Sequence, residues 1–240
     1  MRPGGTFAAW PLTPMVKKIL IINGAIWLAS ALVVVWMKQS WIYEMTAMTP
    51  NRVYPGLEVW QLFTYMWVHS ISPQHIIFNS LFIWMFGGVL EQAWGPKAFL
   101  KFYIFCGVGG GLAAFAVGKF SGDLVPVVGA SGAALGLTVA WVIMYPNKMI
   151  YVFGVIPIRG KYFALFPIGK AALDFVVQAP GVSHAAHLGG MATAAALITG
   201  YWRPSRLYSK LRYIHLKRKL RVIQGSGSQK PPPPDGGYWH

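Results

Sequence analysis

The chain has 240 residues, of which 55% are hydrophobic and 11% are charged, and its formal net charge is +15. An ordinary soluble domain carries about 25% charged residues, so this composition excludes a water-soluble globular protein and predicts several membrane spans. The positive charge would suit nucleic acid, but no recognition motif accompanies it, so that class of function is set aside.

Apolar runs predict six membrane-spanning helices. In chain order they are expected at about 18–37, 74–90, 98–117, 128–145, 162–178 and 184–202. The first run follows two lysines and is longer than the apolar core of a signal peptide, so we expect an uncleaved span. Several other runs are shorter than the roughly 20 residues of a straight span, which predicts close helix packing and a locally thinned bilayer. The predicted fold is therefore an all-α membrane protein built as a six-helix bundle.

The connection 39–72, which follows the first span, is long and rich in aromatic residues. We expect an interfacial helical loop here, with short helices at the level of the headgroups. An ordinary aromatic belt would explain the same side chains. They are Trp41, Tyr43, Tyr54, Trp60, Phe63, Tyr65 and Trp67. The stretch 146–161 is apolar but interrupted by prolines, and we predict a cytoplasmic loop there.

The distribution of Lys and Arg predicts the orientation. Basic residues lie before the first span, between the second and third, between the fourth and fifth, and after the sixth, so both termini are expected to be cytoplasmic. The basic residues beyond the last span are Arg203, Arg206, Lys210, Arg212, Lys217, Arg218, Lys219, Arg221 and Lys230. A basic segment next to a span favours contact with anionic lipid headgroups.

Three segments follow from these patterns: a cytoplasmic N-terminus at 1–17, a membrane domain at 18–202, and a tail at 203–240 that is first basic and then rich in Gly, Ser and Pro. The tail resembles a flexible linker after about 224. A compact six-span layout is typical of a bacterial protein, so we expect the inner membrane. Nothing in the sequence indicates an oligomeric state.

Small residues recur at a spacing of four in two of the predicted spans. Gly132 and Gly136 lie in the fourth, and Gly190 and Ala194 lie in the sixth. This spacing lets helix backbones approach closely. Contact between the fourth and sixth spans is therefore expected.

Polar side chains stand at one depth in three spans that run in the same direction. Asn79 is about five residues into the second span, Ser131 about three into the fourth, and His187 about three into the sixth. At about 1.5 Å per residue, each lies roughly 5–8 Å below the outer end of its helix. Polar groups in a bilayer are costly and are a functional-site hypothesis by default.

These residues suffice for acyl transfer. Serine becomes a nucleophile when a neighbouring histidine takes its proton, as His187 would do for Ser131. Neither Asp174 in the fifth span nor Asp123 in an outer loop is an obvious third member. Donors for an oxyanion are available in Asn79, in the histidine four residues before it on the same helix face, and in an early helix amide.

The motifs His75-x-x-x-Asn79, Gly129-Ala130-Ser131-Gly132 and Ala186-His187-x-x-Gly190 together resemble those of the rhomboid intramembrane serine proteases. Gly87-Gly88 followed by Glu91, and Trp60 before the second span, are also similar to the family. The likeness covers about residues 15–202. A lone G-x-S-G is a weak signal, but three motifs on alternate spans are specific.

The resemblance implies a function and a set of roles. Ser131 would be the nucleophile, His187 the general base, and His75, Asn79 and the Ser131 amide the oxyanion hole. The reaction would be hydrolysis of peptide bonds in or near the spans of single-span membrane proteins, with no metal or cofactor. Span five would gate substrate entry.

Three positions depart from the family pattern. Gln61 stands where many members have arginine, which predicts a weaker anchor for the loop. Leu135 stands where members often have an aromatic ring against the histidine, and Ala194 replaces a glycine.

Other functions are less well supported. A catalytically silent rhomboid-like protein that binds membrane helices is the main alternative, although such relatives usually lack the serine or the histidine. A proton-coupled transporter would predict internal repeats, and none is present. A zinc protease lacks H-E-x-x-H, and an aspartyl protease lacks a second intramembrane aspartate. Lys170 and Asp174 are expected to pair, and His69 and His184 are interpreted as structural or interfacial.

Overall fold

The computed structural model describes residues 10–122, 124–152, 155–177 and 184–200. The chain divides into two compact units, Met1–Ile198 and Thr199–His240, and the bundle of helices forms in the first. The basic and linker-like tail predicted at 203–240, the start of the predicted N-terminal segment, and Asp123 lie outside the described residues.

A helix forms in each of the six predicted runs. They are α1 (Pro14–Ala31), α5 (Pro73–Trp94), α6 (Pro96–Ser121), α7 (Ser131–Met144), α8 (Gly160–Val176) and α9 (His184–Thr199). A π-helical turn, η1 (Leu32–Trp36), extends α1. Three of these helices, Pro14–Trp36, α5 and α6, are long and apolar enough to cross a membrane. The other three have 14, 17 and 16 residues, fewer than the about 20 of a straight span.

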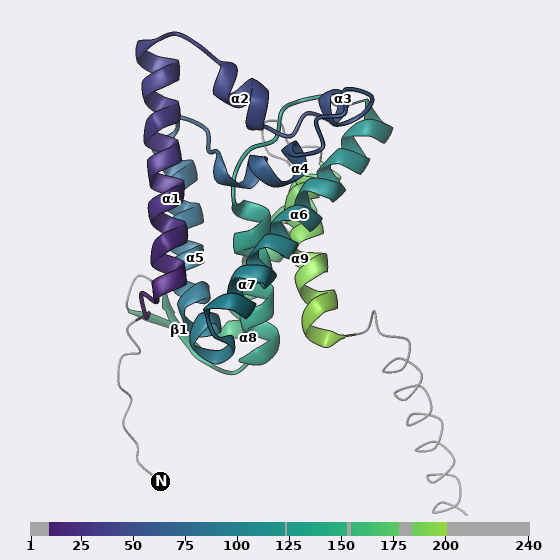
Figure 1. The fold of residues 1–240 in the computed structure, drawn as a ribbon. Helices are drawn as coiled ribbons and strands as arrows, with labels where there is room; N and C mark the ends of the chain where they lie inside the picture. The colour runs from purple at the N-terminus through teal and green to yellow at the C-terminus, as the bar shows by residue number, and fades with distance from the viewer. Residues whose placement is uncertain (1–9, 123, 153–154, 178–183, 201–240) are drawn as a thin grey trace, which may run out of the picture. The chain divides into compact units, whose positions relative to one another are not determined.

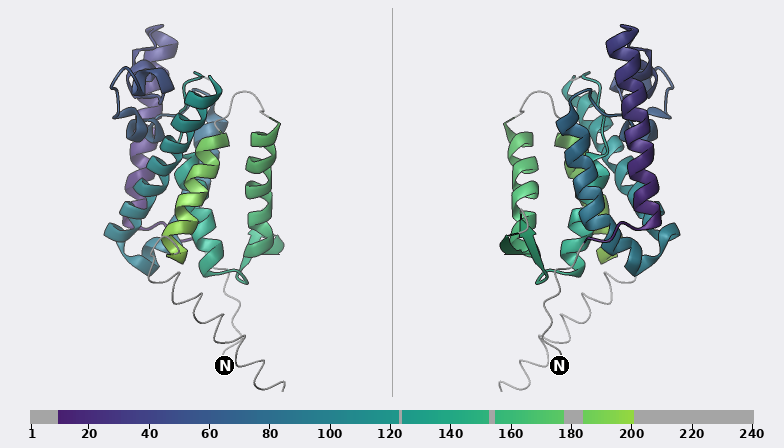
Figure 2. Two further views of the ribbon diagram at one scale, coloured as in Figure 1. Left: turned by 90° about the vertical axis from the view of Figure 1, so that its right-hand side faces the viewer. Right: turned by 90° about the vertical axis from the view of Figure 1, so that its left-hand side faces the viewer.

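The core of the bundle is formed around α7. Nine of its 14 residues are buried, and it packs against α5, α6 and α8. A helix that is apolar on every side suits such a central place. Figure 1 shows α1 and α5 side by side, and these two helices are in contact. Figure 2 shows α8 at the edge of the unit, beside α7.

Four short helices make up the connection after α1. They are α2 (Trp41–Thr46), α3 (Pro50–Val53), α4 (Gln61–Thr64) and the 3-10 turn η2 (Tyr65–Trp67). Among the aromatic residues of this connection, Trp41 and Trp60 are about half exposed. Tyr65 was wrongly grouped with them: it is 1% exposed, and its hydroxyl donates to the Gly107 carbonyl at 2.6 Å.

The segment expected to be a loop at 146–161 contains a β-hairpin instead. Strands β1 (Met149–Val152) and β2 (Ile156–Arg159) pair antiparallel, with Val152 opposite Ile156. The prolines suggested a loop, but in a two-stranded sheet each strand has a free edge, where proline is tolerated. β-branched residues along both strands favour the pairing.

A buried carboxylate joins α5 to the beginning of α1. Glu91, 4% exposed, accepts hydrogen bonds from the amides of Met15 and Val16, both at 2.9 Å, and from the hydroxyl of Thr13. Amides in the first turn of a helix have no partner within it, and the positive end of the helix favours an anion. Glu91 therefore satisfies groups that would be costly to bury.

We predict that Glu91→Gln lowers the free energy of unfolding by about 1–3 kcal/mol, because one acceptor oxygen and the charge are lost beside buried donors. Thermal unfolding in detergent micelles would measure this. Glu44→Gln in α2 makes the same change of charge on a less buried carboxylate and serves as the matched control. Equal melting temperatures for the two variants would contradict the prediction.

Candidate active site

The first residue of α7 is Ser131. The prediction that it lies about three residues inside a helix is therefore wrong. The preceding segment is extended rather than helical: Val127 pairs with Met48, and the Gly129 amide donates to the Tyr65 carbonyl at 2.9 Å. These bonds lead the chain into the interior before the helix begins. The Ser131 amide is consequently one of the first amides of α7, which have no partner within a helix.

The hydroxyl of Ser131 and the imidazole of His187 meet. Ser131 Oγ lies 2.7 Å from His187 Nε2, and the contact is partly buried. His187 is the fourth residue of α9. When Nε2 is the unprotonated nitrogen, the serine hydroxyl donates to it. This is the geometry in which a base can remove the proton of a nucleophile.

Direct backbone contact between α7 and α9 makes this meeting possible. A Cβ atom at Gly190 would lie 2.1 Å from the Gly132 carbonyl oxygen, and one at Gly132 would lie 2.9 Å from the Ala186 carbonyl oxygen. Glycine at both positions lets the two helices touch without side chains between them, as the small-residue spacing predicts. Ser131 precedes the first of these glycines, and His187 lies about one helical turn before the second.

His75 and Asn79 of α5 lie against the segment just before Ser131. Gly129 has φ +117°, a conformation that favours glycine, and a Cβ there would lie 2.6 Å from His75 Nε2 and 3.7 Å from Asn79 Nδ2. Asn79 Nδ2 donates one hydrogen to the His75 carbonyl at 2.9 Å, which leaves its second hydrogen free for another acceptor. All four predicted site residues thus surround the N-terminus of α7.

Ser70, which no sequence motif singled out, sets the tautomer of His75. Its amide donates to His75 Nδ1 at 3.3 Å, and its hydroxyl lies 3.0 Å from the same nitrogen. Because Nδ1 accepts, a neutral His75 carries its hydrogen on Nε2, the nitrogen that faces Gly129. His75 is therefore arranged as a donor towards the site.

His69 supports the same segment. It is fully buried, its Nε2 accepts from the Ala130 amide at 3.3 Å, and its ring packs edge-on against His75 at 5.3 Å. Burial, and then the charge of His75, lower the pKa of His69 from 6.5 to about 4. Neutral His69 can accept the hydrogen bond from Ala130. The only sequence signal was a second histidine six residues before His75.

The residues that depart from the family pattern are well accommodated. Gln61 is fully buried: its Oε1 accepts from the Thr49 amide at 3.0 Å, and its Nε2 donates to Glu58 at 2.7 Å. Arg52 also pairs with Glu58, at 2.9 Å. The loop therefore has a positively charged side chain at position 52, although position 61 holds a glutamine. Leu135 is partly buried against the core.

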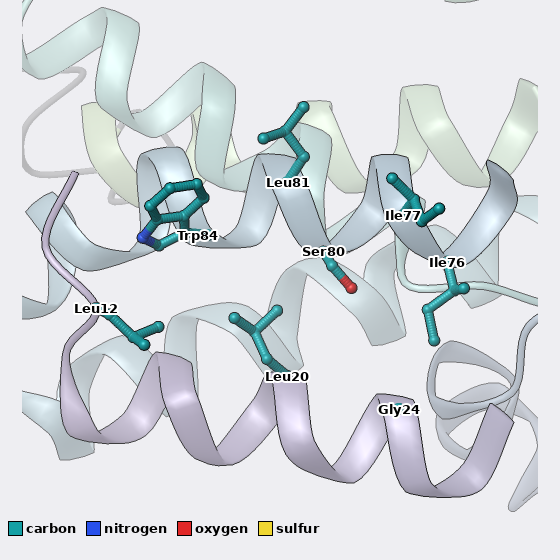
Figure 3. Close-up of a pocket in the computed structure, with 8 residues that line it drawn as sticks. All are labelled: Leu12, Leu20, Gly24, Ile76, Ile77, Ser80, Leu81 and Trp84. Carbon is teal, nitrogen blue, oxygen red and sulfur yellow. The ribbon is translucent and has the colours of Figure 1, made fainter. Parts of the chain in front are cut away.

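Figure 3 shows a separate groove of about 480 Å³ between α1 and α5. It is lined by Leu12, Leu20, Gly24, Ile76, Ile77, Ser80, Leu81 and Trp84. None of these eight residues is an acid or a base. Ser80 points into the groove, so its hydroxyl has no general base among the lining residues. The lining of this groove is therefore almost entirely apolar, and the predicted site residues lie elsewhere, around the N-terminus of α7.

The sequence of the chain is similar to those of known proteins. The profile of the rhomboid domain matches residues 56–204. The chain is 30% identical over 139 residues to "RHOMBOID-like protein 12, mitochondrial" of Arabidopsis thaliana, covering 52% of this chain and 41% of that protein. It is 27% identical over 135 residues to "Rhomboid protease GluP" of Bacillus subtilis (strain 168), covering 56% and 24%. It is 31% identical over 179 residues to "Rhomboid protease AarA" of Providencia stuartii, covering 68% and 59%.

A helical bundle with three helices of membrane-spanning length and composition defines an integral membrane protein. The chain belongs to the rhomboid family, whose profile covers more than half of it. It spans 41% and 24% of the length of the first two relatives named above.

We predict that Gly190→Ala lowers the free energy of unfolding by about 1–3 kcal/mol, because the added methyl group would overlap the Gly132 backbone. Gly169→Ala in α8 is the control, since a Cβ there meets nothing within 4 Å and alanine favours a helix. Unfolding in micelles would compare the two. A Gly190→Ala protein as stable as the control would show that the backbones do not touch.

We predict acid sensitivity from His69. Its folded-state pKa is lowered to about 4 from 6.5, so between these values the unfolded chain binds a proton that the folded chain does not. The contribution of neutral His69 to the free energy of unfolding is therefore fully present above about pH 6.5. It is lost as the pH falls, by up to about 1.4 kcal/mol per pH unit. His69→Gln keeps an acceptor for Ala130 but does not titrate. Melting temperatures from pH 7 to 4.5 should converge for the two proteins, and parallel curves would refute this.

Proposed function

We propose that the chain is an intramembrane serine endopeptidase in which Ser131 is the nucleophile and His187 is the general base. The observation that carries the proposal is the 2.7 Å contact between Ser131 Oγ and His187 Nε2. Its position beside buried hydrogen-bond donors supports acyl transfer. Two of the named relatives are called rhomboid proteases, and this supports the choice of peptide bonds as the substrate.

The proposed reaction begins when Ser131 Oγ attacks the scissile carbonyl carbon and His187 Nε2 takes the hydroxyl proton. The carbonyl oxygen becomes an oxyanion, which accepts from His75 Nε2–H, from the free Asn79 amide hydrogen and from the Ser131 amide. The C–N bond then breaks, and protonated His187 gives its proton to the leaving amine. Water hydrolyses the acyl-enzyme by the same steps, with His187 again as base.

The topology is part of the proposal. All six helices would cross the membrane, with the short α7, α8 and α9 accommodated by packing and a thinned bilayer. Both termini would be cytoplasmic, in a bacterial inner membrane, and the helices of 39–72 would lie in the interface. The site would then open towards the outer side. Substrates would be single-span membrane proteins, with α8 gating their entry, and the tail at 203–240 would contact anionic lipid.

We predict that a fluorophosphonate probe labels the purified protein in detergent and that Ser131→Ala abolishes labelling, because the probe reacts with an activated serine. His187→Ala should reduce the labelling rate by about 10²-fold or more, since it removes the base. Ser80→Ala is the control, because this serine lies in the groove between α1 and α5.

Cleavage of a single-span substrate in proteoliposomes gives the second measurement and should depend on the same two residues. Labelling that survives in Ser131→Ala would refute the assignment of the nucleophile. A wild-type protein that neither labels nor cleaves, yet co-purifies with membrane helices, would favour a catalytically silent rhomboid-like protein.

A further inference from the structure

A chain of charged and polar groups leads from α8 to the proposed base. Lys170 Nζ lies 2.6 Å from Asp174 Oδ2, one helical turn away. The same carboxylate oxygen lies 3.8 Å from His184 Nδ1 in α9. The His184 ring in turn lies edge-on to that of His187, with the ring centres 6.4 Å apart and the planes at 73°. The last member of this chain contacts Ser131.

Asp174 provides what the dyad itself lacks. During acyl transfer the imidazole of His187 becomes positively charged, and a carboxylate commonly stabilises that charge. Among the described residues, Asp174 is the acid that contacts the pair formed by His184 and His187, through its 3.8 Å approach to His184 Nδ1.

We propose that Asp174 in α8 is a positioning residue for the dyad and that it acts on His187 through His184. Lys170 partly neutralises the charge of Asp174 and so limits its effect on His187. This inference rests on the proposed function. The carboxylate of Asp174 lies 3.8 Å from the ring of His184 across the two helices, and that ring lies edge-on to the ring of His187. Its negative charge favours the positively charged imidazole that forms when Ser131 loses its proton.

An ordinary stabilising ion pair between Lys170 and Asp174 is the simpler explanation of the same contact. The Lys170 side chain is 63% exposed and that of Asp174 is 17% exposed, and exposed pairs of this kind contribute little to stability. That explanation does not account for the position of His184, which is 7% exposed and shares the carboxylate. It also predicts no change in the chemistry of the site.

The test is the pH dependence of kcat/KM for cleavage of a single-span substrate in proteoliposomes. Asp174→Asn should move the acidic limb to lower pH by about half a unit or more and slow the plateau several-fold, because it removes an attracting charge. Lys170→Gln should move the same limb in the opposite direction, because it removes a repelling charge. A purely structural role predicts no such pair of opposite shifts.

Two further variants complete the design. Glu44→Gln makes the same change of charge in α2, which holds none of the site residues, and should leave the limb in place. In a His184→Gln background, Asp174→Asn should have a smaller effect, because the connecting ring is gone. Lys170→Gln changes an exposed side chain, so it provides a folded variant even where Asp174→Asn does not fold.

The outcomes separate the inference from the function. Suppose that the wild type cleaves the substrate and Ser131→Ala does not. Unshifted acidic limbs in Asp174→Asn and Lys170→Gln would then overturn the role of Asp174 and leave the proposed protease function intact. Cleavage that persists in Ser131→Ala would overturn the proposed function itself.

Discussion

The contact between the backbones of α7 and α9 is the constraint on which the site depends. Ser131 and His187 have short side chains, so they reach 2.7 Å only where no side chain separates the two helices. Glycine at 132 and at 190 provides this contact. Lipid tails are as apolar as helix side chains, so a bilayer provides no hydrophobic driving force between helices. Their association therefore depends on close van der Waals packing. The glycines that let the helices pack therefore stand beside, or one turn from, the residues of the proposed dyad.

A second constraint concerns the polar groups taken into the bundle, several of which are paired. Glu91 satisfies the first amides of α1, and Gln61 satisfies the loop after it. His69 and Ser70 do the same at the site, where they hold Ala130 and His75. Unpaired, each of these groups would cost about 1–3 kcal/mol. The bonds made by His69 and Ser70 also fix the positions of the donors that an oxyanion would meet.

Much of this could be predicted from the sequence, and the rest could not for physical reasons. Apolar runs predicted the positions of the helices because lipid imposes a length and a composition on a span. Motif spacing singled out Ser131 and His187, although it placed Ser131 too deep in its helix. Periodicity cannot detect an extended segment such as that before α7, which is held by bonds to Met48 and Tyr65, residues far away in the chain. The hairpin at 149–159 was missed because its prolines suggested a loop.

α8 lies at the edge of the bundle, so the effect of Asp174 on His187 depends on where this helix lies. Asp174 and His184 belong to different helices, so the 3.8 Å contact between them exists only when α8 lies against the rest of the bundle. A displacement of α8 would take the carboxylate away from His184 and would weaken the stabilisation of a charged His187. In the proposed function, where α8 gates substrate entry, a substrate helix beside α8 would therefore alter the base as well as gain access to it. The strength of the base would then be coupled to the position of α8, because a carboxylate stabilises a nearby charge only while it stays within reach.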